Sequence, residues 1–382
     1  MSHDVVESVR ELVPAVRERA ERTEADRRVS DEVVAALLER GLFGMALPKR
    51  YGGTEAHPVD FFTAVRALAA ACPSTGWVAS LLGAARWHLA MLPPQAQDEV
   101  WDGTPDALVS ASYAPSGRLV PVEGGYRLSG EWKSVPGVDH STWCMLGCLV
   151  LGQAEEPVDY RSVLVPRSDY RVAEAWNVVG LHGAGSRDVT VRGAFVPAHR
   201  VYDSTRRDRS ADGTSMRLMP LGPLHCVAVT MPVVGAAEGA YAYHLDRMRR
   251  RNELSRGGRS EDGAAHVAVA RGEAELDAAV LQVERDLREL VDHAERGVPV
   301  PKELRLRARR DQVRATERSV EALDLLFKVA GGHSVRMDAP IQRAWRDAHT
   351  AAAHVANSAE LPLSLYGCWA HGLDADDTLL LV

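Results

Sequence analysis

The chain has 382 residues, a formal net charge of −7 at neutral pH and 46 % hydrophobic residues. This length and composition predict a large core in two or three packed subdomains and argue against intrinsic disorder. Arginine alternates with acidic residues, as in RRDQVRATERSVEALD, so we expect solvated helix faces and no nucleic-acid surface.

The cysteines are odd in number and lack C-x-x-C spacing; they are Cys72, Cys144, Cys148, Cys226 and Cys368. This pattern predicts neither a disulfide framework nor a metal site and fits a reducing cytoplasm. The first residues, MSHDVVESVRELVPAV, carry acids where a signal peptide is basic and then apolar. No uncharged apolar stretch approaches about 18 residues, so we expect no membrane-spanning segment and a cytoplasmic location.

The N-terminal region, residues 1–107, is predicted to be a helical domain. In SDEVVAALLERG, Ser30 is placed to cap a helix, acids follow in its first turn, and Gly41 ends it. Pro73 opens another helix, and its sequence STGWVASLLGAARWHLAML is apolar nearly all round. We expect that helix to be buried in the middle of the protein.

Over residues 108–205 the hydrophobic period changes to two, which predicts a small antiparallel β domain. In GGYRLSGEWKS, Tyr126, Leu128 and Trp132 fall on one face of a strand. RSVLVP and DVTVRGAFVP are further strands, each ended by proline.

Residues 206–382 are predicted to form a C-terminal helical bundle, after a polar, arginine-rich loop at 204–214. Two helices carry apolar stripes at helical spacing, and the second is stopped by Gly331 and Gly332. Two long antiparallel helices followed by a shorter one indicate a four-helix bundle. The stretch QRAWRDAHTAAAHVAN, residues 342–357, is interpreted as one further helix. It places His349 and His354 on different faces, which argues against a shared metal.

This order of helical domain, β domain and helical bundle resembles the plan of the acyl-CoA dehydrogenase fold. The motifs are similar to those of its two-component flavin-dependent monooxygenases, which hydroxylate p-hydroxyphenylacetate, steroid-derived phenols and aromatic polyketides. The resemblance rests on YGGTEAHPVDFFTAVRALAAACPSTGWVASLLG, VSASYAPSG, GGYRLSGEW, WNVVGLHGAGSRDVTVRGAFVPAHRV and GGHSVRMDAPIQRAWRDAHTAAAHVAN. It implies a mainly α fold with a central antiparallel β domain.

The resemblance leaves a choice between dehydrogenase and oxygenase chemistry. A dehydrogenase of this fold needs a glutamate that removes a proton beside a carbonyl group. Its usual place matches AAAHVAN, which has no acid, and its alternative place falls near His225 in GPLHCVAV. Glu360 lies too far along the chain to substitute, so the missing carboxylate favours an oxygenase.

In the oxygenases, reduced flavin captures O2 as a hydroperoxide, which survives in a dry pocket with hydrogen-bond donors. His354 matches the family's functional C-terminal histidine; the alternative is a structural histidine at a helix end. Ser134 is a second candidate for peroxide stabilisation, because Val135 and Pro136 stand where relatives carry Ser or Thr. His88, one turn beyond the usual histidine position, is a candidate base for a phenol; the alternative is a buried core histidine.

The resemblance also assigns cofactor contacts on the β domain. It implies that Ser110, Ser112 and Tyr113 hydrogen-bond the edge of the isoalloxazine, unless VSASYAPSG is an ordinary strand-to-turn segment. It places Trp132 in a segment that walls the flavin.

Further contacts are implied between subunits. Arg251 matches an arginine that reaches a flavin phosphate, often on a neighbouring subunit, although Arg249 and Arg250 compete for that role. Gly331 and Gly332 resemble a pair that lets backbone approach the cofactor, and a helix C-cap is the alternative. GLHGAGS lacks the context of a Rossmann or P-loop motif, so the reductant is expected to come from a separate flavin reductase.

These expectations combine into one leading hypothesis: an oxygenase component that uses FMNH2 and O2 to hydroxylate a phenolic or polycyclic aromatic substrate. FADH2 is the alternative cofactor, and a homotetramer and a role in secondary metabolism are implied. A site lined by acids would instead favour N-oxygenation of an amino sugar or other amine. An acyl-CoA dehydrogenase with a displaced base and a non-enzymatic bundle are the remaining alternatives.

Overall fold

The structure is a computed structural model that describes residues 2–152, 154, 156–173, 176–203, 220–254 and 263–376. The predicted loop at 204–214 lies outside these residues. The N-terminal helices are α1 Ser2–Arg10, α2 Val13–Ala25, α3 Asp31–Glu39, α4 Pro58–Ala71, α5 Pro73–Leu89 and α6 Pro94–Trp101. The strands are β1 Val109–Val122, β2 Gly125–Val135, β3 Trp143–Leu151, β4 Pro157–Pro166, β5 Tyr170–Ala173, β6 Arg187–Pro197 and β7 Val201–Tyr202. The C-terminal helices are α8 Leu221–Leu254, α9 Gly263–Glu295, α10 Lys302–Val329, α11 Pro340–Ala352 and α12 Glu360–Ala370.

The N-terminal helices begin and end at the predicted signals. The Oγ of Ser30 accepts a hydrogen bond from the N–H of Val33 at 3.3 Å and caps α3. Gly41, just after the end of α3, has a φ of +79°, which glycine adopts without strain. Every residue of α5 is buried, as its sequence predicts.

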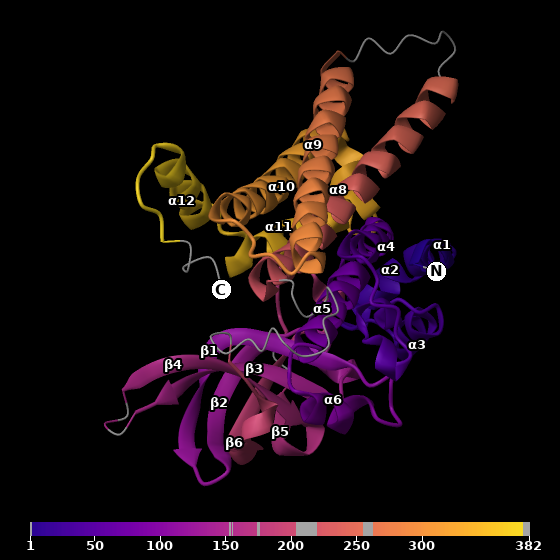
Figure 1. The fold of residues 1–382 in the computed structure, drawn as a ribbon. Helices are drawn as coiled ribbons and strands as arrows, with labels where there is room; N and C mark the ends of the chain where they lie inside the picture. Colours follow the sequence, from indigo (N-terminus) through magenta and orange to yellow (C-terminus); the bar gives the residue numbers. More distant parts are fainter. Residues whose placement is uncertain are drawn as a thin grey trace.

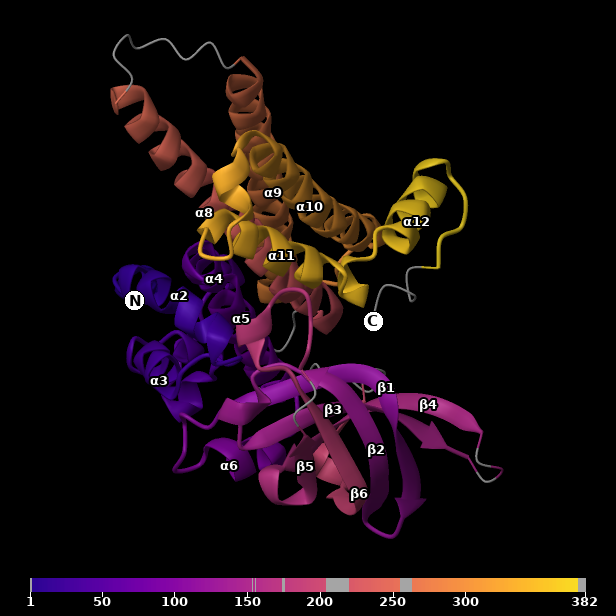
Figure 2. The same cartoon turned by 180° about the vertical axis from the view of Figure 1, so that it is seen from behind.

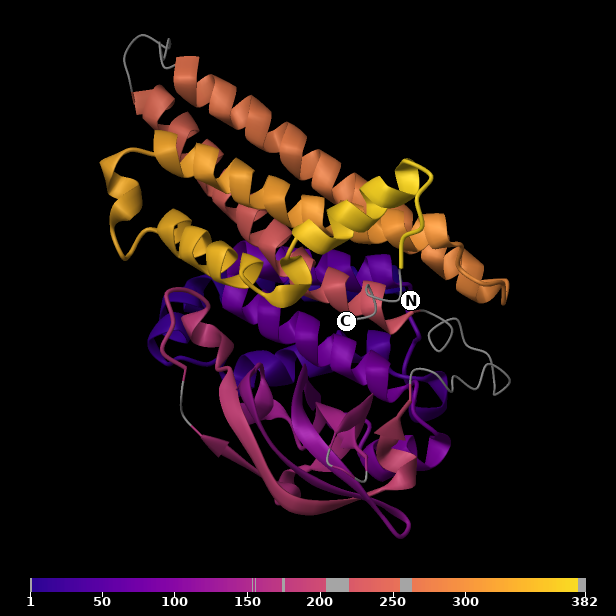
Figure 3. The ribbon, with the colours of Figure 1, turned by 90° about the vertical axis from the view of Figure 1, so that its left-hand side faces the viewer.

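Helix α8 joins the two helical parts into one core. It packs against α4 and α5 on one side and against α10 and α11 on the other, and a single hydrophobic cluster spans these helices. Figure 3 shows the bundle, the N-terminal helices and the sheet stacked as three layers. By length and hydropathy α8 could cross a membrane, which the sequence analysis missed, but 83 % of its most apolar stretch is buried inside the protein.

The described strands form one sheet in the order β5-β6-β2-β1-β3-β4-β7, below the helices in Figure 1. The sheet is mixed, which corrects the antiparallel prediction: β1 and β3 pair in parallel, while the other neighbours are antiparallel. After the β1–β2 hairpin the chain crosses over and returns on the far side of β1. Alternating hydrophobicity reports which face of a strand is buried but not the strand's direction, so it could not reveal this crossover.

The C-terminal helices confirm the predicted bundle. Among the described residues, α8, α9, α10 and α11 pack together, and the ends of α8 and α9 extend beyond the other helices (Figures 1 and 2). The α9 stripe faces the core with Leu276, Val283, Leu287 and Leu290 buried. Helix α12 packs on α10 at the outside of the bundle.

Helices α4 and α5 approach closely at Gly76. A Cβ at this position would lie 2.4 Å from the Cβ of Ala69 and 2.7 Å from its Cα, so backbone would have to move. We expect Gly76→Ala to lower the free energy of unfolding by about 1–3 kcal/mol in urea titrations. The matched control is Gly367→Ala in α12, where a Cβ meets nothing within 4 Å, and it should be neutral or stabilising by up to about 1 kcal/mol. Equal effects of the two substitutions would contradict the packing argument.

Candidate active site

A continuous series of aromatic and imidazole rings lies where the sheet meets the helices. We call this series the ring chain; in spatial order it consists of Trp77, His354, His225, Tyr113, His88 and Tyr202. Neighbouring ring centroids are between 4.6 and 6.1 Å apart. The rings come from α5, β1, β7, α8 and the segment after α11, so the ring chain is assembled by the tertiary fold.

In the middle of the ring chain, the phenol of Tyr113 is hydrogen-bonded to the imidazole of His88. The hydroxyl of Tyr113 lies 3.0 Å from Nδ1 of His88. Burial raises the pKa of Tyr113 well above its ordinary value, so the phenol keeps its proton and can donate it to this nitrogen when Nδ1 is unprotonated. His88 is completely buried and also packs against the ring of Tyr202. His88 therefore lies behind Tyr113, which matches the alternative interpretation of a core histidine.

His354 is held at the break between α11 and the 3-10 turn Val355–Asn357. Residues 342–357 are therefore not one helix, as the sequence analysis interpreted them. The reason is local: Nδ1 of His354 accepts a hydrogen bond from the N–H of Ala356 at 3.1 Å and caps the turn, with its backbone extended. Burial lowers the pKa of His354 to about 4, so the ring is neutral near pH 7. With Nδ1 an acceptor, the proton is on Nε2, which makes His354 a hydrogen-bond donor.

A buried polar network fixes the turn that carries His354. Oδ1 of Asn357 accepts hydrogen bonds from Thr230 at 2.9 Å, Gln312 at 2.9 Å and Thr316 at 3.0 Å. All four side chains are at most 5 % exposed. Because the donors come from α8 and α10, the orientation of His354 is set by the bundle.

His225, on α8, is a member of the ring chain that the sequence analysis did not predict as a site residue. Its ring meets Tyr113 edge-on at 4.7 Å and 87°, and lies 6.1 Å from the ring of His354. Burial, followed by the charges of His354, His88 and Arg309, lowers the pKa of His225 to about 3. The sequence marked His225 as lying near the alternative glutamate position of the dehydrogenases, but a histidine near the start of an apolar helix is more typical of a core position.

The ring chain contains no acid within the part of the chain that the structure describes, and His225 and His354 are neutral near pH 7. Burial is the only cause that shifts the pKa of His354, and no carboxylate is among the causes for His225. Over the same residues, no group of His, Cys, Asp or Glu could hold a metal ion. The site therefore offers neutral donors and acceptors and no carboxylate base.

The structure brings only one of the predicted β1 residues into the ring chain. Ser110 and Ser112 point to the opposite face of β1 from Tyr113, because side chains alternate along a strand. Ser110 is 1 % exposed and donates to the hydroxyl of Ser141 at 2.8 Å, so its hydroxyl has a partner within the protein. Ser112 is half-buried beside the irregularity in the β1–β3 pairing.

Trp132 also lies apart from the ring chain, since its indole is completely buried in the core of the sheet. Its Nε1 donates to the carbonyl of Gly147 at 2.8 Å. Ser134, two residues on, is exposed with a φ of +56°, and its N–H donates to Asp188 at 3.1 Å. No contact within the described residues joins Ser134 to the ring chain.

The residues predicted to act between subunits lie apart from the ring chain. Arg251 is exposed near the C-terminal end of α8, 26 residues beyond His225 and thus about 39 Å along the helix axis. Gly331 and Gly332 are exposed after the end of α10, where Gly331 has a φ of +75°. Gly331 directly follows Ala330, the C-cap residue of α10, so the pair lies at the end of this helix.

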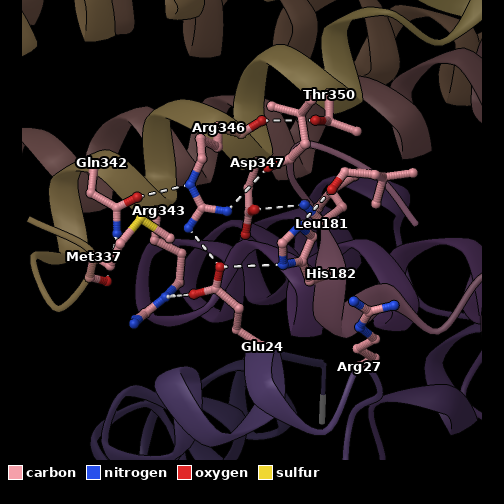
Figure 4. Close-up of polar contacts among 12 residues, drawn as sticks. Glu24, Arg27, Leu181, His182, Met337, Gln342, Arg343, Arg346, Asp347 and Thr350 are labelled. Carbon is pink, nitrogen blue, oxygen red and sulfur yellow. Dashed lines mark hydrogen bonds and ion pairs between the residues drawn. The ribbon is translucent and has the colours of Figure 1, made fainter. Parts of the chain in front are cut away.

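Helix α11 is anchored to the N-terminal helices through Glu24 of α2 (Figure 4). Oε2 of Glu24 accepts a hydrogen bond from Arg343 at 2.7 Å, and Oε1 accepts one from Arg346 at 2.6 Å. One residue further along α11, Asp347 accepts the N–H of Leu181 at 2.6 Å. These contacts tie α2, α11 and the segment before β6 together, and they place the end of α11, where His354 lies.

The neutral imidazoles of His225 and His354 should make the stability of the fold depend on pH. The pKa values of His225 and His354 lie below the ordinary 6.5, so below that pH the unfolded chain binds protons that the folded chain does not. Their contribution to stability is complete above pH 6.5 and is lost as the pH falls toward about 4. Each histidine contributes at most about 1.4 kcal/mol per pH unit to the slope of unfolding free energy against pH. We expect His354→Asn to flatten the fall in unfolding free energy between pH 6.5 and 4.5, measured by urea titration; an unchanged slope would contradict the assigned neutral state.

Comparison with known proteins agrees with this architecture. Residues 2–101 match the sequence model of the acyl-CoA dehydrogenase N-terminal domain, and residues 227–359 match that of the acyl-CoA dehydrogenase C-terminal domain. The chain is 41 % identical to the flavin-dependent monooxygenase oxygenase subunit HsaA of Rhodococcus jostii, over 97 % of this chain and 98 % of that one. It is 35 % identical to the FADH(2)-dependent resorcinol hydroxylase oxygenase component of a Rhizobium species, over 89 % and 87 %. The crystal structure of 3-HSA hydroxylase from Rhodococcus sp. RHA1 has a TM-score of 0.95 and 40 % identity, over 100 % of this chain and 99 % of that one.

The protein is an enzyme with the acyl-CoA dehydrogenase fold, which confirms the predicted fold class. Within that fold, the chain belongs to the flavin-dependent monooxygenases, as an oxygenase component of the aromatic hydroxylases.

Proposed function

We propose that this oxygenase hydroxylates a phenolic ring, on a monocyclic or polycyclic aromatic compound such as a steroid-derived phenol or an aromatic polyketide. The observation that carries the proposal is the ring chain, in which neutral imidazoles and a phenol meet without a carboxylate among the described residues. A dehydrogenase would need an acid there. The names of the relatives support the substrate class, because resorcinol is itself a phenol.

The residues present fit a flavin. Tyr113 on β1 and the Nε2–H of His354 supply polar groups beside flat aromatic surfaces such as Trp77, and the absence of charge suits an isoalloxazine ring. When bound, reduced flavin supplies two electrons and activates O2, so that one oxygen atom enters the substrate and the other leaves as water. His354 donates a hydrogen bond from a position fixed by its cap, and the buried rings of Trp77, His88 and Tyr202 limit the access of water to the ends of the ring chain. His88 positions the hydroxyl of Tyr113.

We also propose a homotetramer in which a neighbouring subunit completes the flavin site with Arg251, Gly331 and Gly332. Their exposure, and the distance of Arg251 from the ring chain, support a role between subunits. Light scattering on the purified protein tests the tetramer, and a monomer that retains full activity would refute it. The free cysteines support the proposed cytoplasmic location.

The flavin is proposed to arrive already reduced from a separate reductase, as FMNH2 or FADH2. The subunit and component names of the relatives support a separate partner, and one of those names specifies FADH(2). The test combines the protein with NADH, a purified flavin reductase, FMN or FAD, and resorcinol or 2-naphthol, with product measured by mass spectrometry. We expect product only when protein, reductase and flavin are all present. Turnover without a reductase would overturn the two-component proposal, and the ratio of FMN- to FAD-supported product identifies the cofactor.

N-oxygenation of an amine is the second candidate from the sequence. A protonated amine would be stabilised by acids, and none contributes to the electrostatics of His225 or His354 among the described residues. The observed site therefore favours a phenol over an amine.

A further inference from the structure

The three imidazoles of the ring chain have different partners. Nδ1 of His354 is occupied by the N–H of Ala356, which leaves this ring a donor through Nε2. Nδ1 of His88 is occupied by the hydroxyl of Tyr113, and the ring is completely buried. The half-buried ring of His225 makes no hydrogen bond to the described residues. A neutral imidazole with a free nitrogen can accept a proton, so the structure leaves the acceptor role to His225.

We propose, building on the hydroxylation of a phenol, that His225 is a further catalytic residue, which accepts the substrate's phenolic hydroxyl as a hydrogen-bond donor and takes its proton during oxygen transfer. This assignment moves the base from α5, where the sequence offered His88 as a candidate beside the alternative of a core histidine, to α8. His354 and His225 then have complementary roles, one as donor and one as acceptor, with ring centroids 6.1 Å apart.

An electron pair of the phenolic oxygen enters the ring, and a ring carbon forms a C–O bond to one oxygen atom of the activated O2, which arrives as a hydroxyl group while the O–O bond breaks. The phenolic O–H bond breaks at the same time, and its proton moves to His225. The resulting dienone becomes aromatic when the substituted carbon loses its hydrogen as a proton and the carbonyl oxygen regains the proton from His225. The proton lost from carbon ends in the water that carries the second oxygen atom, and the two electrons come from the reduced flavin.

A weakly basic imidazole is sufficient for this step. A free phenol of the tyrosine type has a pKa near about 10, but its O–H becomes far more acidic as the ring gives electrons to oxygen. The groups that face His225 are Tyr113 from β1, His354 beyond α11, His88 from α5 and Arg309 from α10. None of them is an anion, so they keep His225 deprotonated until the substrate's proton becomes acidic.

The first test is a single-turnover reaction of His225→Asn and His225→Gln with pre-reduced flavin, O2 and two probes at pH 8. The probes are phenol, which is protonated, and 4-nitrophenol, whose more acidic hydroxyl is mostly ionised and whose ortho carbons keep their hydrogens. Without the base we expect product formation from phenol to fall by about 100-fold or more, while 4-nitrophenol reacts within about tenfold of the unmodified protein. The matched control is His349→Asn on α11. His349 lies outside the ring chain and is hydrogen-bonded to Asp324, so this substitution should leave both rates unchanged.

Equal losses on both probes would show a structural role for His225, and no loss on either would show no role; both results overturn the proposal. A second readout needs neither flavin nor turnover. In protein labelled with 15N-histidine, one imidazole resonance, absent from His225→Asn, should shift when phenol is added, and an unshifted resonance would also refute the assignment. If the unmodified protein hydroxylates neither probe, the proposed function fails, and the 15N shift alone then decides whether His225 binds a phenolic hydroxyl.

Discussion

We expect His354→Ala to lower the yield of hydroxylated product per reduced flavin by about 100-fold, with hydrogen peroxide formed instead. The reason is the loss of a donor that is fixed in a water-excluded site, since removing one such donor costs about 10²–10³ in rate. Nε2 of His354 carries the proton because Nδ1 accepts the N–H of Ala356, and the turn is held by Asn357 and its buried partners. The measurement is product and peroxide per flavin in single turnovers.

A matched variant separates the chemistry of His354 from its structural role. His354→Asn keeps a side chain that caps the turn at Val355–Asn357, because asparagine is a favoured N-cap residue. It should fold as the unmodified protein does, yet lose product yield as His354→Ala does. Full yield in His354→Asn would show that the cap alone matters and would remove His354 from the catalytic residues.

We expect Glu24→Gln to lower the free energy of unfolding by about 3–5 kcal/mol. The side chains of Arg343 and Arg346 are only 8 % and 13 % exposed, and both pair with Glu24. Removing the negative charge leaves two largely buried cations without a carboxylate, although Arg346 keeps its hydrogen bonds to Gln342 and to the carbonyl of Val179. This loss is costly because water cannot replace the carboxylate. The measurement is the shift in the urea midpoint, with the slope of the transition compared to confirm similar cooperativity.

The control for this prediction is an exposed ion pair on α1. Glu7 and Arg10 are about half exposed, so Glu7→Gln should change the unfolding free energy by less than about 1 kcal/mol. If Glu24→Gln behaves like Glu7→Gln, the pairing in Figure 4 does not anchor α11. Because α11 leads to His354, we also expect Glu24→Gln to reduce product yield at temperatures where it remains folded.

Local signals in the sequence predicted much of the fold. The cap at Ser30, the stop at Gly41 and the all-apolar α5 depend on neighbouring residues or on simple burial, and the structure confirms them. The parallel pairing of β1 and β3 was missed, since a period of two gives no direction. The end of α11 was missed because the composition of residues 352–354 permits a helix. Only the hydrogen bond from the N–H of Ala356 to Nδ1 of His354 shows where the helix breaks.

The site was harder to predict than the fold because it is assembled from distant segments. The resemblance singled out Tyr113, which lies in the ring chain. It also singled out Ser110 and Trp132, whose side chains are buried and hydrogen-bond to Ser141 and to the carbonyl of Gly147. Strand alternation could have separated Ser110 from Tyr113. His225 was missed as a site residue because one histidine in an apolar helix does not reveal which rings it will meet.

The most direct test of the central claim is a single turnover without reductase, in which the protein is loaded anaerobically with chemically reduced flavin and then mixed with 18O2 and a phenol. A neutral site that supports oxygen transfer should place one 18O atom in the product and yield little peroxide. No labelled product, together with reduction of bound FAD by an acyl-CoA under argon, would show that the protein removes hydrogen from a thioester and would contradict the account.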